Sequence, residues 1–400
     1  MPNLLTGSVA PQHQTFELTR TADGGISAPV ALRQGAESAR PLQPLVFAFG
    51  RLGDMVMLSS VVHLLHHRFG RRCLVVGAGA WNSRLYDDHP DVERVLSFSR
   101  HMPFMLSAAW WQVLFALHQS APGPIYVCER SPRQLIRIRR MLKISGIDPS
   151  RCVFMSDIVD AGEHWTDRYV RLGQLTPPAI GAAEYPLSSS VKPAPRLSVS
   201  DTERSALGDW LRARGWLGRK LVLVQPGNFR SMSRRREQWR RLNADDKAWP
   251  VENWVALARK VLGALPDALV VLCGAPQEGE MLREIQLAAA TPDVVAAELG
   301  LRELLGMSES AHSMISVDTG PAHAAAALGL PLVVMFGAET QGEWLPRSPS
   351  GSPVLGIGGP PASRRVDQIS VQEVLDAWCS LLPTVADRQT PASNHSECAY

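Results

Sequence analysis

Several features that define large classes of proteins are absent from this 400-residue sequence or scarce in it. Its 41 Lys and Arg residues stand against 38 Asp and Glu, a net charge of only +3. A dedicated nucleic-acid-binding protein usually has a larger and more clustered basic excess. No segment reaches the roughly 18 uncharged apolar residues that a membrane-spanning helix needs. We therefore expect a soluble protein that does not bind nucleic acid.

Paired cysteines are also missing. The six cysteines are scattered, at Cys73, Cys128, Cys152, Cys273, Cys379 and Cys398. Because no two of them have Cys-x-x-Cys spacing, neither a zinc site nor a disulfide framework is predicted. Scattered thiols are typical of a cytoplasmic protein, and the first residues, MPNLLTGSVAPQHQ, lack the charged-then-apolar order of a signal peptide. A cytoplasmic location is expected.

What the sequence does contain is a hydrophobic fraction of 45%, arranged in short apolar runs that alternate with helical patterns. Strands are predicted at 44–50, 73–76, 94–98, 125–128, 221–225, 268–273, 314–317 and 332–336. Helices are predicted at 104–117, 133–142, 251–265, 278–289 and 322–328, with another ending at Gly70. This alternation predicts an α/β protein with two parallel, doubly wound, Rossmann-like sheets. Such sheets bind ligands beyond the carboxyl ends of their strands.

Composition divides the chain into four parts. Residues 1–40 are polar without sustained periodicity and are predicted to be a disordered extension. Prolines and serines interrupt the alternation between 176 and 199, which places a domain boundary there. We therefore expect an N-terminal domain at 41–185, a C-terminal domain at 186–382 and a flexible tail at 383–400.

The strongest local signal is the segment 316–323, Ser-Val-Asp-Thr-Gly-Pro-Ala-His, in which an apolar strand turns into a helix of small residues. Backbone N–H groups at a helix start attract anions. Gly320 would let a phosphate approach the backbone, and Thr319 and His323 can add donors. The simpler alternative is a strand–helix corner in which Asp318 only caps the helix.

Three further charged residues stand near predicted helix starts. Lys247, just before Trp249-Pro250, would suit a diphosphate as a point charge, or is an ordinary solvated loop lysine. Glu278 follows an apolar strand. There it could accept hydrogen bonds from ribose hydroxyls, or it could simply be a first-turn glutamate that interacts favourably with the helix dipole. Asp54, in the turn Arg51-Leu52-Gly53-Asp54, could be a general base for an acceptor hydroxyl or a helix cap.

Taken in order, these segments resemble glycosyltransferase family nine from about Pro44 to about Pro346. The shared pieces are the Arg-x-Gly-Asp turn, the Lys-x-Trp-Pro segment, the Gly-x-x-x-Glu turn, the Asp-Thr-Gly-x-x-His corner, and Phe336-Gly337 followed by Trp344-x-Pro346. The resemblance implies the GT-B architecture, with two Rossmann-like domains facing a cleft. It also implies an inverting transfer of a sugar, typically heptose from ADP-heptose, to a lipopolysaccharide-type acceptor.

Residue roles follow from the same resemblance. Asp54 looks like the base, and Lys247 and Thr319-Gly320 like diphosphate contacts. Glu278 and Asp318 look like donor-site residues, with His323 in support. No cofactor is implied beyond the nucleotide-sugar co-substrate. No metal is expected either, because the sequence has no Asp-x-Asp motif with which to hold a divalent ion, so Lys247 and the helix start would balance the diphosphate charge.

Two basic clusters lie outside these motifs. One, in the long connection from Pro226 to Lys247, comprises Arg230, Arg234, Arg235, Arg236, Arg240 and Arg241. The other, on a predicted helix, comprises Arg133, Arg137, Arg139, Arg140 and Lys143. Blocks of like charge are most often simply solvated. Together with Arg51 they could instead bind an anionic glycan or glycolipid acceptor, or the surface of the inner membrane.

Three other functions fit the same pattern of strands and helices. A dehydrogenase would use Gly77-Ala78-Gly79, but Asn82 stands where the third glycine of the dinucleotide-binding motif belongs. A non-catalytic sugar-nucleotide or glycan-binding protein and a sugar-nucleotide epimerase are the other two, because a fold does not determine a function.

Overall fold

The computed structural model describes residues 40–79, 81–98, 108–119, 123–187, 194–228 and 245–382. The expected extension up to residue 39 and the expected tail at 383–400 lie outside these residues. So do Arg234, Arg235 and the other arginines of the long connection. Within the described part, no helix combines the length and the apolar character that crossing a bilayer requires.

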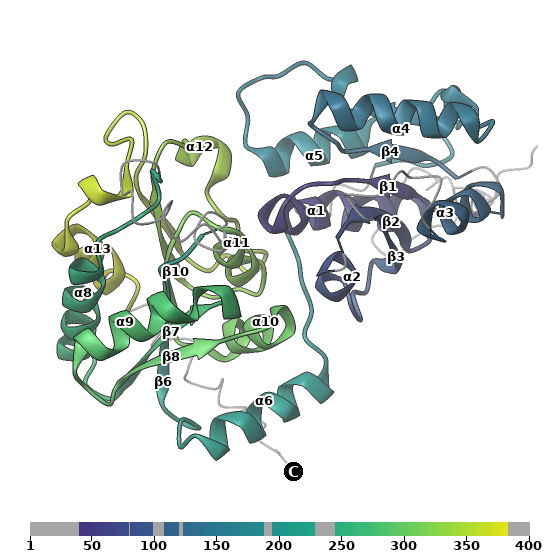
Figure 1. The fold of residues 1–400 in the computed structure, drawn as a ribbon. Helices are drawn as coiled ribbons and strands as arrows, with labels where there is room; N and C mark the ends of the chain where they lie inside the picture. Colours follow the sequence, from purple (N-terminus) through teal and green to yellow (C-terminus); the bar gives the residue numbers. More distant parts are fainter. Residues whose placement is uncertain are drawn as a thin grey trace, which may run out of the picture. The chain divides into compact units, whose positions relative to one another are not determined.

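The first half of the described chain forms a sheet of five parallel strands (Figure 1). The strands are β1 (Leu45–Phe47), β2 (Cys73–Ala78), β3 (Val92–Phe98), β4 (Ile125–Val127) and β5 (Cys152–Phe154). The helices are α1 (Leu52–Phe69), α2 (Trp81–Leu85), α3 (Ala108–Gln119), α4 (Pro132–Ile144) and α5 (Trp165–Gln174). The strand order β3-β2-β1-β4-β5 means that the chain reverses its direction of travel across the sheet between β1 and β4.

Helices α3 and α4 cover one face of this sheet. Trp110 and Val113 of α3 and Ile138 and Met141 of α4 are buried in one core with the strand residues that point toward them. Helix α1 contacts α5, where Gly173 lets the two backbones approach: a Cβ at Gly173 would lie 2.6 Å from a methyl carbon of Val61. Because α3 and α4 pack against the same face of the sheet, their outward sides belong to the same surface of the molecule.

The second half forms a sheet of six parallel strands in the order β11-β10-β9-β6-β7-β8 (Figure 1). The strands are β6 (Lys220–Gln225), β7 (Ala268–Gly274), β8 (Val294–Glu298), β9 (Ser313–Val317), β10 (Leu332–Phe336) and β11 (Val354–Gly358). The helices are α6 (Asp201–Ala213), α8 (Val251–Ala264), α9 (Gly279–Ala289), α10 (Leu301–Ser310), α11 (Gly320–Ala327), α12 (Gln341–Trp344) and α13 (Val371–Cys379). Here the reversal falls between β6 and β9.

Helices cover both faces of the second sheet. Side chains of α8, α9 and α13 pack with Val222 and Val224 of β6 on one face. Side chains of α6, α10 and α11 pack with Leu221 and Leu223 on the other. Because alternate residues of one strand enter opposite cores, both faces are apolar, which is the pattern of a buried parallel sheet. The predicted doubly wound α/β arrangement is confirmed.

Helices α1 and α11 approach each other unusually closely. A Cβ on Gly320 would lie only 2.6 Å from Cβ of Leu52, and one on Gly53 would lie 3.0 Å from Cδ2 of His323. Leu52 therefore occupies the space beside Gly320, which the sequence had led us to leave for a phosphate. Packing between the two helices is reason enough for glycine at position 320.

We expect Gly320→Ala to destabilise the protein by about 1–3 kcal/mol, because the added methyl group overpacks a tight contact. Gly263→Ala in α8 is the matched control, since nothing lies within 4 Å of a Cβ there. That control should stabilise the protein by about 0.4–1 kcal/mol. Urea unfolding followed by circular dichroism measures both. Equal stabilities of Gly320→Ala and the wild type would mean that α1 and α11 are not held this closely.

Candidate functional site

The two reversals of strand order define where a ligand should bind. In open parallel sheets, ligands bind beyond the carboxyl ends of the strands at the point of reversal. In the first sheet, β1 runs into the turn that carries Asp54. In the second, β9 runs into Asp318 and α11. The α1–α11 contact brings these two strand ends together: a Cβ on Gly53 would lie 3.7 Å from Cα of Gly320.

Asp54 lies in the first turn of α1, where both of its carboxylate oxygens have partners. Oδ2 accepts from the backbone N–H of Arg51 at 2.9 Å. The capping alternative is thus partly right, although Arg51 is the N-cap residue and Asp54 is the third residue of the helix. Oδ1 accepts from Nη1 of Arg130 at 3.1 Å, and the Asp54 side chain is 18% exposed. The carboxylate is fixed in orientation and accessible.

Arg130, which the sequence analysis did not single out, is held against two indole rings. Its guanidinium carbon lies 4.1 Å from the ring centroid of Trp165 and 4.9 Å from that of Trp344. The ring centroids are 5.6 Å apart. Stacking of a guanidinium on aromatic rings adds a favourable cation–π interaction. Arg130 lies three residues beyond Val127, the last residue of β4, so a charged residue shortly after a buried strand was the available signal.

Glu129 fixes the end of β4 beside the end of β1. Its Oε2 accepts from the backbone N–H of Phe49 at 2.9 Å, and its Oε1 accepts from those of Arg130 and Ser131 at 2.9 and 2.8 Å. Glu129 is buried. A buried carboxylate that accepts several backbone hydrogen bonds is a rigid support, so the backbone of Arg130 is anchored to the residue that follows β1 and Ala48.

Lys247 is bound to Asp318 rather than solvated. Its Nζ donates to Oδ2 of Asp318 at 2.5 Å and to the Asp318 carbonyl oxygen at 3.0 Å. The lysine side chain is 21% exposed and the aspartate side chain 7%. An ammonium group has three donors, so this pairing leaves one for a ligand.

The start of α11 has no side-chain cap. Thr319, not Asp318, is the N-cap residue, and its side chain makes no capping hydrogen bond. The hydroxyl groups of Thr319 and Ser316 lie 3.3 Å apart instead. The alternative in which Asp318 merely caps the helix is therefore not what the structure shows.

His323 is buried between α11 and α1. Its Nε2 lies 3.9 Å from Oδ1 of Asp318, and its Nδ1 has no hydrogen-bond partner among the described residues. Burial lowers the pKa of His323, and the neighbouring carboxylates of Asp318 and Asp54 oppose that shift. The neutral ring of His323 packs against Gly53, so this residue influences the site by supporting the contact between α1 and α11.

Glu278 is buried at the end of β7, one strand away from the reversal. Its carboxylate accepts from the backbone N–H of Ala275 at 2.9 Å, so it at least caps the turn before α9. A role in ribose binding stays a prediction. Asn82 fills the turn that a dinucleotide would need, because a Cβ at Gly77 would lie 2.7 Å from its Nδ2, which donates to the Ala78 carbonyl at 2.7 Å.

The predicted anion-binding arginines are separated in the structure. Arg51 lies at the start of α1 beside Asp54, and its side chain is exposed. Arg133 and Arg137 are exposed on α4. The second cluster is thus a helix surface rather than part of the turn around Asp54.

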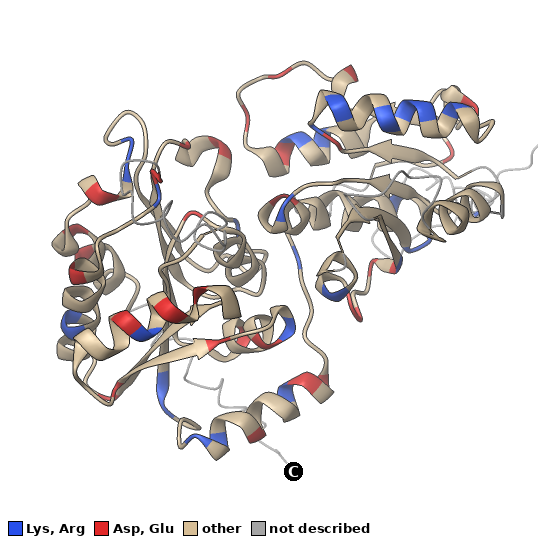
Figure 2. Cartoon of the chain, in the orientation of Figure 1, with Lys and Arg blue, Asp and Glu red and all other residues tan. Residues whose placement is uncertain are grey.

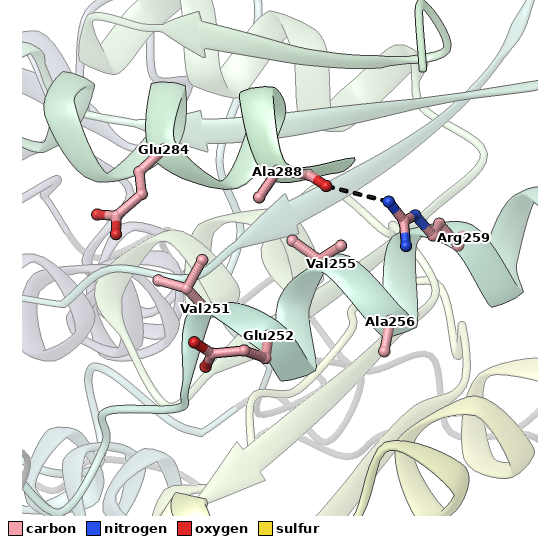
Figure 3. Close-up of a pocket in the computed structure, with 7 residues that line it drawn as sticks. All are labelled: Val251, Glu252, Val255, Ala256, Arg259, Glu284 and Ala288. Carbon is pink, nitrogen blue, oxygen red and sulfur yellow. Dashed lines mark hydrogen bonds between the residues drawn. The ribbon is translucent and has the colours of Figure 1, made fainter. Parts of the chain in front are cut away.

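A hollow between α8 and α9 contains none of the predicted site residues (Figure 3). Glu252 and Glu284 line it, and Arg259 donates to the backbone carbonyl of Ala288 at 3.1 Å. Two carboxylates beside an arginine that already binds a carbonyl do not favour an anionic ligand. The strand ends around Asp54 and Asp318 are the better candidate.

Helix α5 and the segment after α12 are joined by polar contacts. Asp167 and Arg347 form a two-pronged ion pair, at 2.5 and 2.7 Å. Nε2 of His164 donates to the Leu345 carbonyl at 2.8 Å, and burial, followed by the charge of Arg347, lowers the pKa of His164 to about 4. These contacts hold Trp165 and Trp344 together around Arg130.

Comparison with known proteins agrees with this geometry. Residues 191–371 match the family model described as "Glycosyltransferase family 9 (heptosyltransferase)". Lipopolysaccharide heptosyltransferase 1 of Escherichia coli K12 is 32% identical over 101 residues, which cover 24% of this chain and 30% of that protein. Lipopolysaccharide heptosyltransferase 3 of Escherichia coli is 32% identical over 132 residues, 28% of this chain and 39% of that protein. The aligned part thus spans about a third of the curated relatives' length.

Solved structures share the fold over nearly the whole described chain. The Escherichia coli ADP-heptose lipopolysaccharide heptosyltransferase II superimposes with a TM-score of 0.65 at 20% identity, covering 86% of this chain and 99% of its own. The family 9 glycosyltransferase of Veillonella parvula gives 0.66 at 14%, covering 87% and 99%. These similarities confirm the GT-B architecture with two Rossmann-like sheets. The family-model match and the relatives in sequence show that the second half of the chain is similar to glycosyltransferase family 9.

Proposed function

We propose that this protein is an inverting glycosyltransferase that moves a sugar, most simply a heptose, from a nucleotide-diphosphate donor to a lipopolysaccharide-type acceptor. One observation carries the proposal. The α1–α11 contact joins a fixed, accessible carboxylate, Asp54, to an uncapped helix start beside the Lys247–Asp318 pair. A base on one side and diphosphate-binding groups on the other are what a direct displacement at a sugar carbon requires.

In the proposed reaction, Asp54 takes the proton of an acceptor hydroxyl. The hydroxyl oxygen then attacks the anomeric carbon, and the bond from that carbon to the diphosphate oxygen breaks. The diphosphate leaves with the electron pair, so its negative charge grows in the transition state. The third N–H of Lys247 and the first backbone N–H groups of α11 are the groups that would stabilise this charge.

The donor is proposed to be an ADP-sugar, and no metal or further cofactor takes part in the transfer. Support comes from the relatives, whose names specify heptosyltransferase activity and, for one solved structure, ADP-heptose. Asp318 holds Lys247 in place through two contacts, so a cation is already present where a metal ion would otherwise be needed. Two competing functions remain: epimerisation of a sugar nucleotide, and binding of a sugar nucleotide or glycan without catalysis. Either could use the same donor site.

We expect Asp54→Asn to lower the turnover number for sugar transfer by about 10²–10⁴-fold, since asparagine keeps the shape but cannot accept the proton. Binding of the donor should change little. The assay follows transfer from ADP-heptose to a lipopolysaccharide-core acceptor, with the anomeric configuration of the product read by NMR.

Asp157→Asn is the matched control for that experiment. Asp157 also accepts a backbone N–H within a capping box, from Phe154, and also pairs with an arginine, Arg139 at 3.6 Å. Turnover of the control should remain normal. Near-normal turnover of Asp54→Asn would rule out the base assignment, and epimerised or hydrolysed donor without transfer would favour a competing function.

We expect Lys247→Ala to weaken ADP binding by about 10- to 150-fold, the value of one hydrogen bond between charged groups, 1.5–3 kcal/mol. Adenosine, which has no phosphate, should bind as it does to the wild type. Calorimetric titration of the wild type with ADP, UDP, GDP and TDP also identifies which nucleotide base the donor carries.

Lys220→Ala is the control for Lys247→Ala. It removes another Lys–Asp pair, with Asp267 at 3.1 Å, from the opposite end of the same sheet. Equal losses for ADP and adenosine in Lys247→Ala would show that the lysine acts through folding and not through the diphosphate.

The acceptor is proposed to be an anionic glycolipid that the protein meets at a membrane surface. The outward side of α4 is basic, as the blue bands along this helix show (Figure 2). Its exposed residues recur at helical spacing: Arg133, Ile136, Arg137, Arg140, Lys143 and Ile144. On the same sheet face, α3 exposes 64% of Trp111 and 61% of Phe115. Basic residues beside exposed apolar ones are typical of surfaces that bind anionic lipid.

We expect the double variant Arg133→Glu/Arg140→Glu to bind phosphatidylglycerol-containing vesicles at least roughly 30-fold more weakly, at about 1 kcal/mol for each basic residue lost. Arg212→Glu, on the exposed side of α6, should bind like the wild type. Sedimentation with vesicles measures both, and phosphatidylcholine vesicles should bind neither variant nor the wild type. Unchanged binding of the double variant would exclude α4 as the contact.

A further inference from the structure

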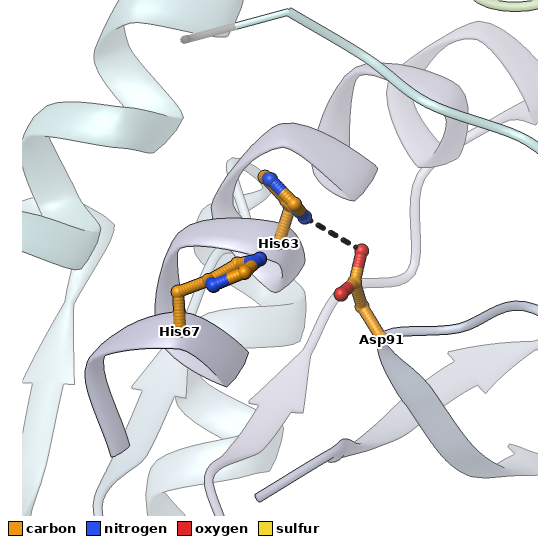
Figure 4. Close-up of side chains that lie close together, drawn as sticks. All are labelled: His63, His67 and Asp91. Atoms are coloured by element: carbon orange, nitrogen blue, oxygen red, sulfur yellow. Dashed lines mark hydrogen bonds and ion pairs between the residues drawn. The ribbon is translucent and has the colours of Figure 1, made fainter. Parts of the chain in front are cut away.

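A cluster of histidines surrounds a buried carboxylate at the far end of α1 (Figure 4). Asp91 stands directly before β3, and its side chain is 4% exposed. Oδ2 lies 2.9 Å from Nδ1 of His63, and Oδ1 lies 2.7 Å from Nδ1 of His66. His67 follows on the same helix, its ring centroid 4.4 Å from that of His63.

Three of these side chains have the spacing of metal ligands. One ligand atom each from His63, His67 and Asp91 lie within 4.8 Å of one another. A tetrahedral zinc ion with bonds of about 2.0–2.2 Å keeps its ligand atoms about 3.3–3.6 Å apart. The nitrogen of His63 and the oxygen of Asp91 are closer than that, at 2.9 Å, and all three ligand atoms lie within 4.8 Å of one another. Small side-chain rotations would therefore complete the site. His63 and His67 are four residues apart, which places both rings on one side of α1.

The surroundings prepare these groups for a cation. His66 holds the second oxygen of Asp91, and the backbone N–H of Asp91 donates to Nδ1 of His89 at 3.2 Å. Such supporting hydrogen bonds orient the ligands of a metal. His67 is exposed, so an ion can enter from solvent.

We propose that His63, His67 and Asp91 bind a divalent transition-metal ion of the zinc type, with the ion replacing the proton that now joins His63 to Asp91. Two imidazoles and one carboxylate suit zinc, whereas calcium needs 6–8 oxygen ligands and magnesium prefers oxygen. A fourth position is left for water or for another side chain.

The proposed metal site is structural and separate from sugar transfer. His63 lies nine residues beyond Asp54 along α1, a distance of about 14 Å at 1.5 Å per residue. Asp91 is at the amino end of β3, whereas the candidate active site is at the carboxyl ends of the strands. A bound ion would therefore tie the last turns of α1 to the edge of the first sheet and could not reach the diphosphate.

The test uses the full chain, freed of metal by a chelator and then titrated with Zn²⁺ or Co²⁺. We expect uptake of one ion per chain, a higher melting temperature and, with Co²⁺, the visible absorption of a tetrahedral nitrogen–oxygen site. His67→Gln should weaken the binding by about 10–100-fold or more, because it removes a direct ligand. This variant should fold, since His67 makes none of the hydrogen bonds to Asp91 described above.

His118→Gln is the control, an exposed histidine on α3 whose Nδ1 donates to the Leu114 carbonyl of its own helix at 2.8 Å. It should bind Zn²⁺ like the wild type. The proposal is overturned if the wild type takes up no stoichiometric ion, or if His67→Gln binds as tightly as the wild type. Equal weakening in His118→Gln would place any binding elsewhere and overturn it too. His63→Gln gives a second, independent reading of the same site.

Discussion

The contact between α1 and α11 is the constraint on which the candidate active site depends. Each sheet has one reversal of strand order, and each reversal opens into the first turn of one of these helices. The two turns can approach each other this closely only because residues 53 and 320 are glycines, which carry no side chain. A base supplied by one sheet and an anion-binding helix start supplied by the other then share one volume of space.

Much of this arrangement could be predicted because its signals are local. Buried parallel strands are short apolar runs, and Asp318, Thr319 and Gly320 follow such a run directly, so their place at a strand end was readable. The strand β1 was overestimated, since it covers only Leu45–Phe47, although the backbone N–H of Ala48 still donates to the Val76 carbonyl of β2 at 3.0 Å. Strand β5 and helix α5 were missed because β5 is only three residues long and the buried side of α5 includes Thr166 and Gly173, which are not large apolar residues.

Contacts between distant residues could not be predicted in the same way. The Asp54–Arg130 pair joins residues 76 positions apart, and the Lys247–Asp318 pair joins residues 71 apart. The position of Arg130 beyond a buried strand is a local signal, but its place beside β1 and Asp54 follows from the strand order. The role first given to Gly320 shows the same limit, since a glycine needed for a neighbouring helix and one needed for a ligand look identical in sequence.

The neighbouring indoles of Trp165 and Trp344, whose planes are tilted by 37°, have a consequence for observing the molecule in solution. One indole belongs to a helix after the first sheet and the other to a helix after β10 of the second. Indoles with centroids 5.6 Å apart couple their excited states, and the coupling falls steeply as they separate. Any motion that separates α5 from α12 would therefore change the near-ultraviolet circular dichroism that arises from this coupling. The separation of the two helices can be followed in this way without attaching a dye.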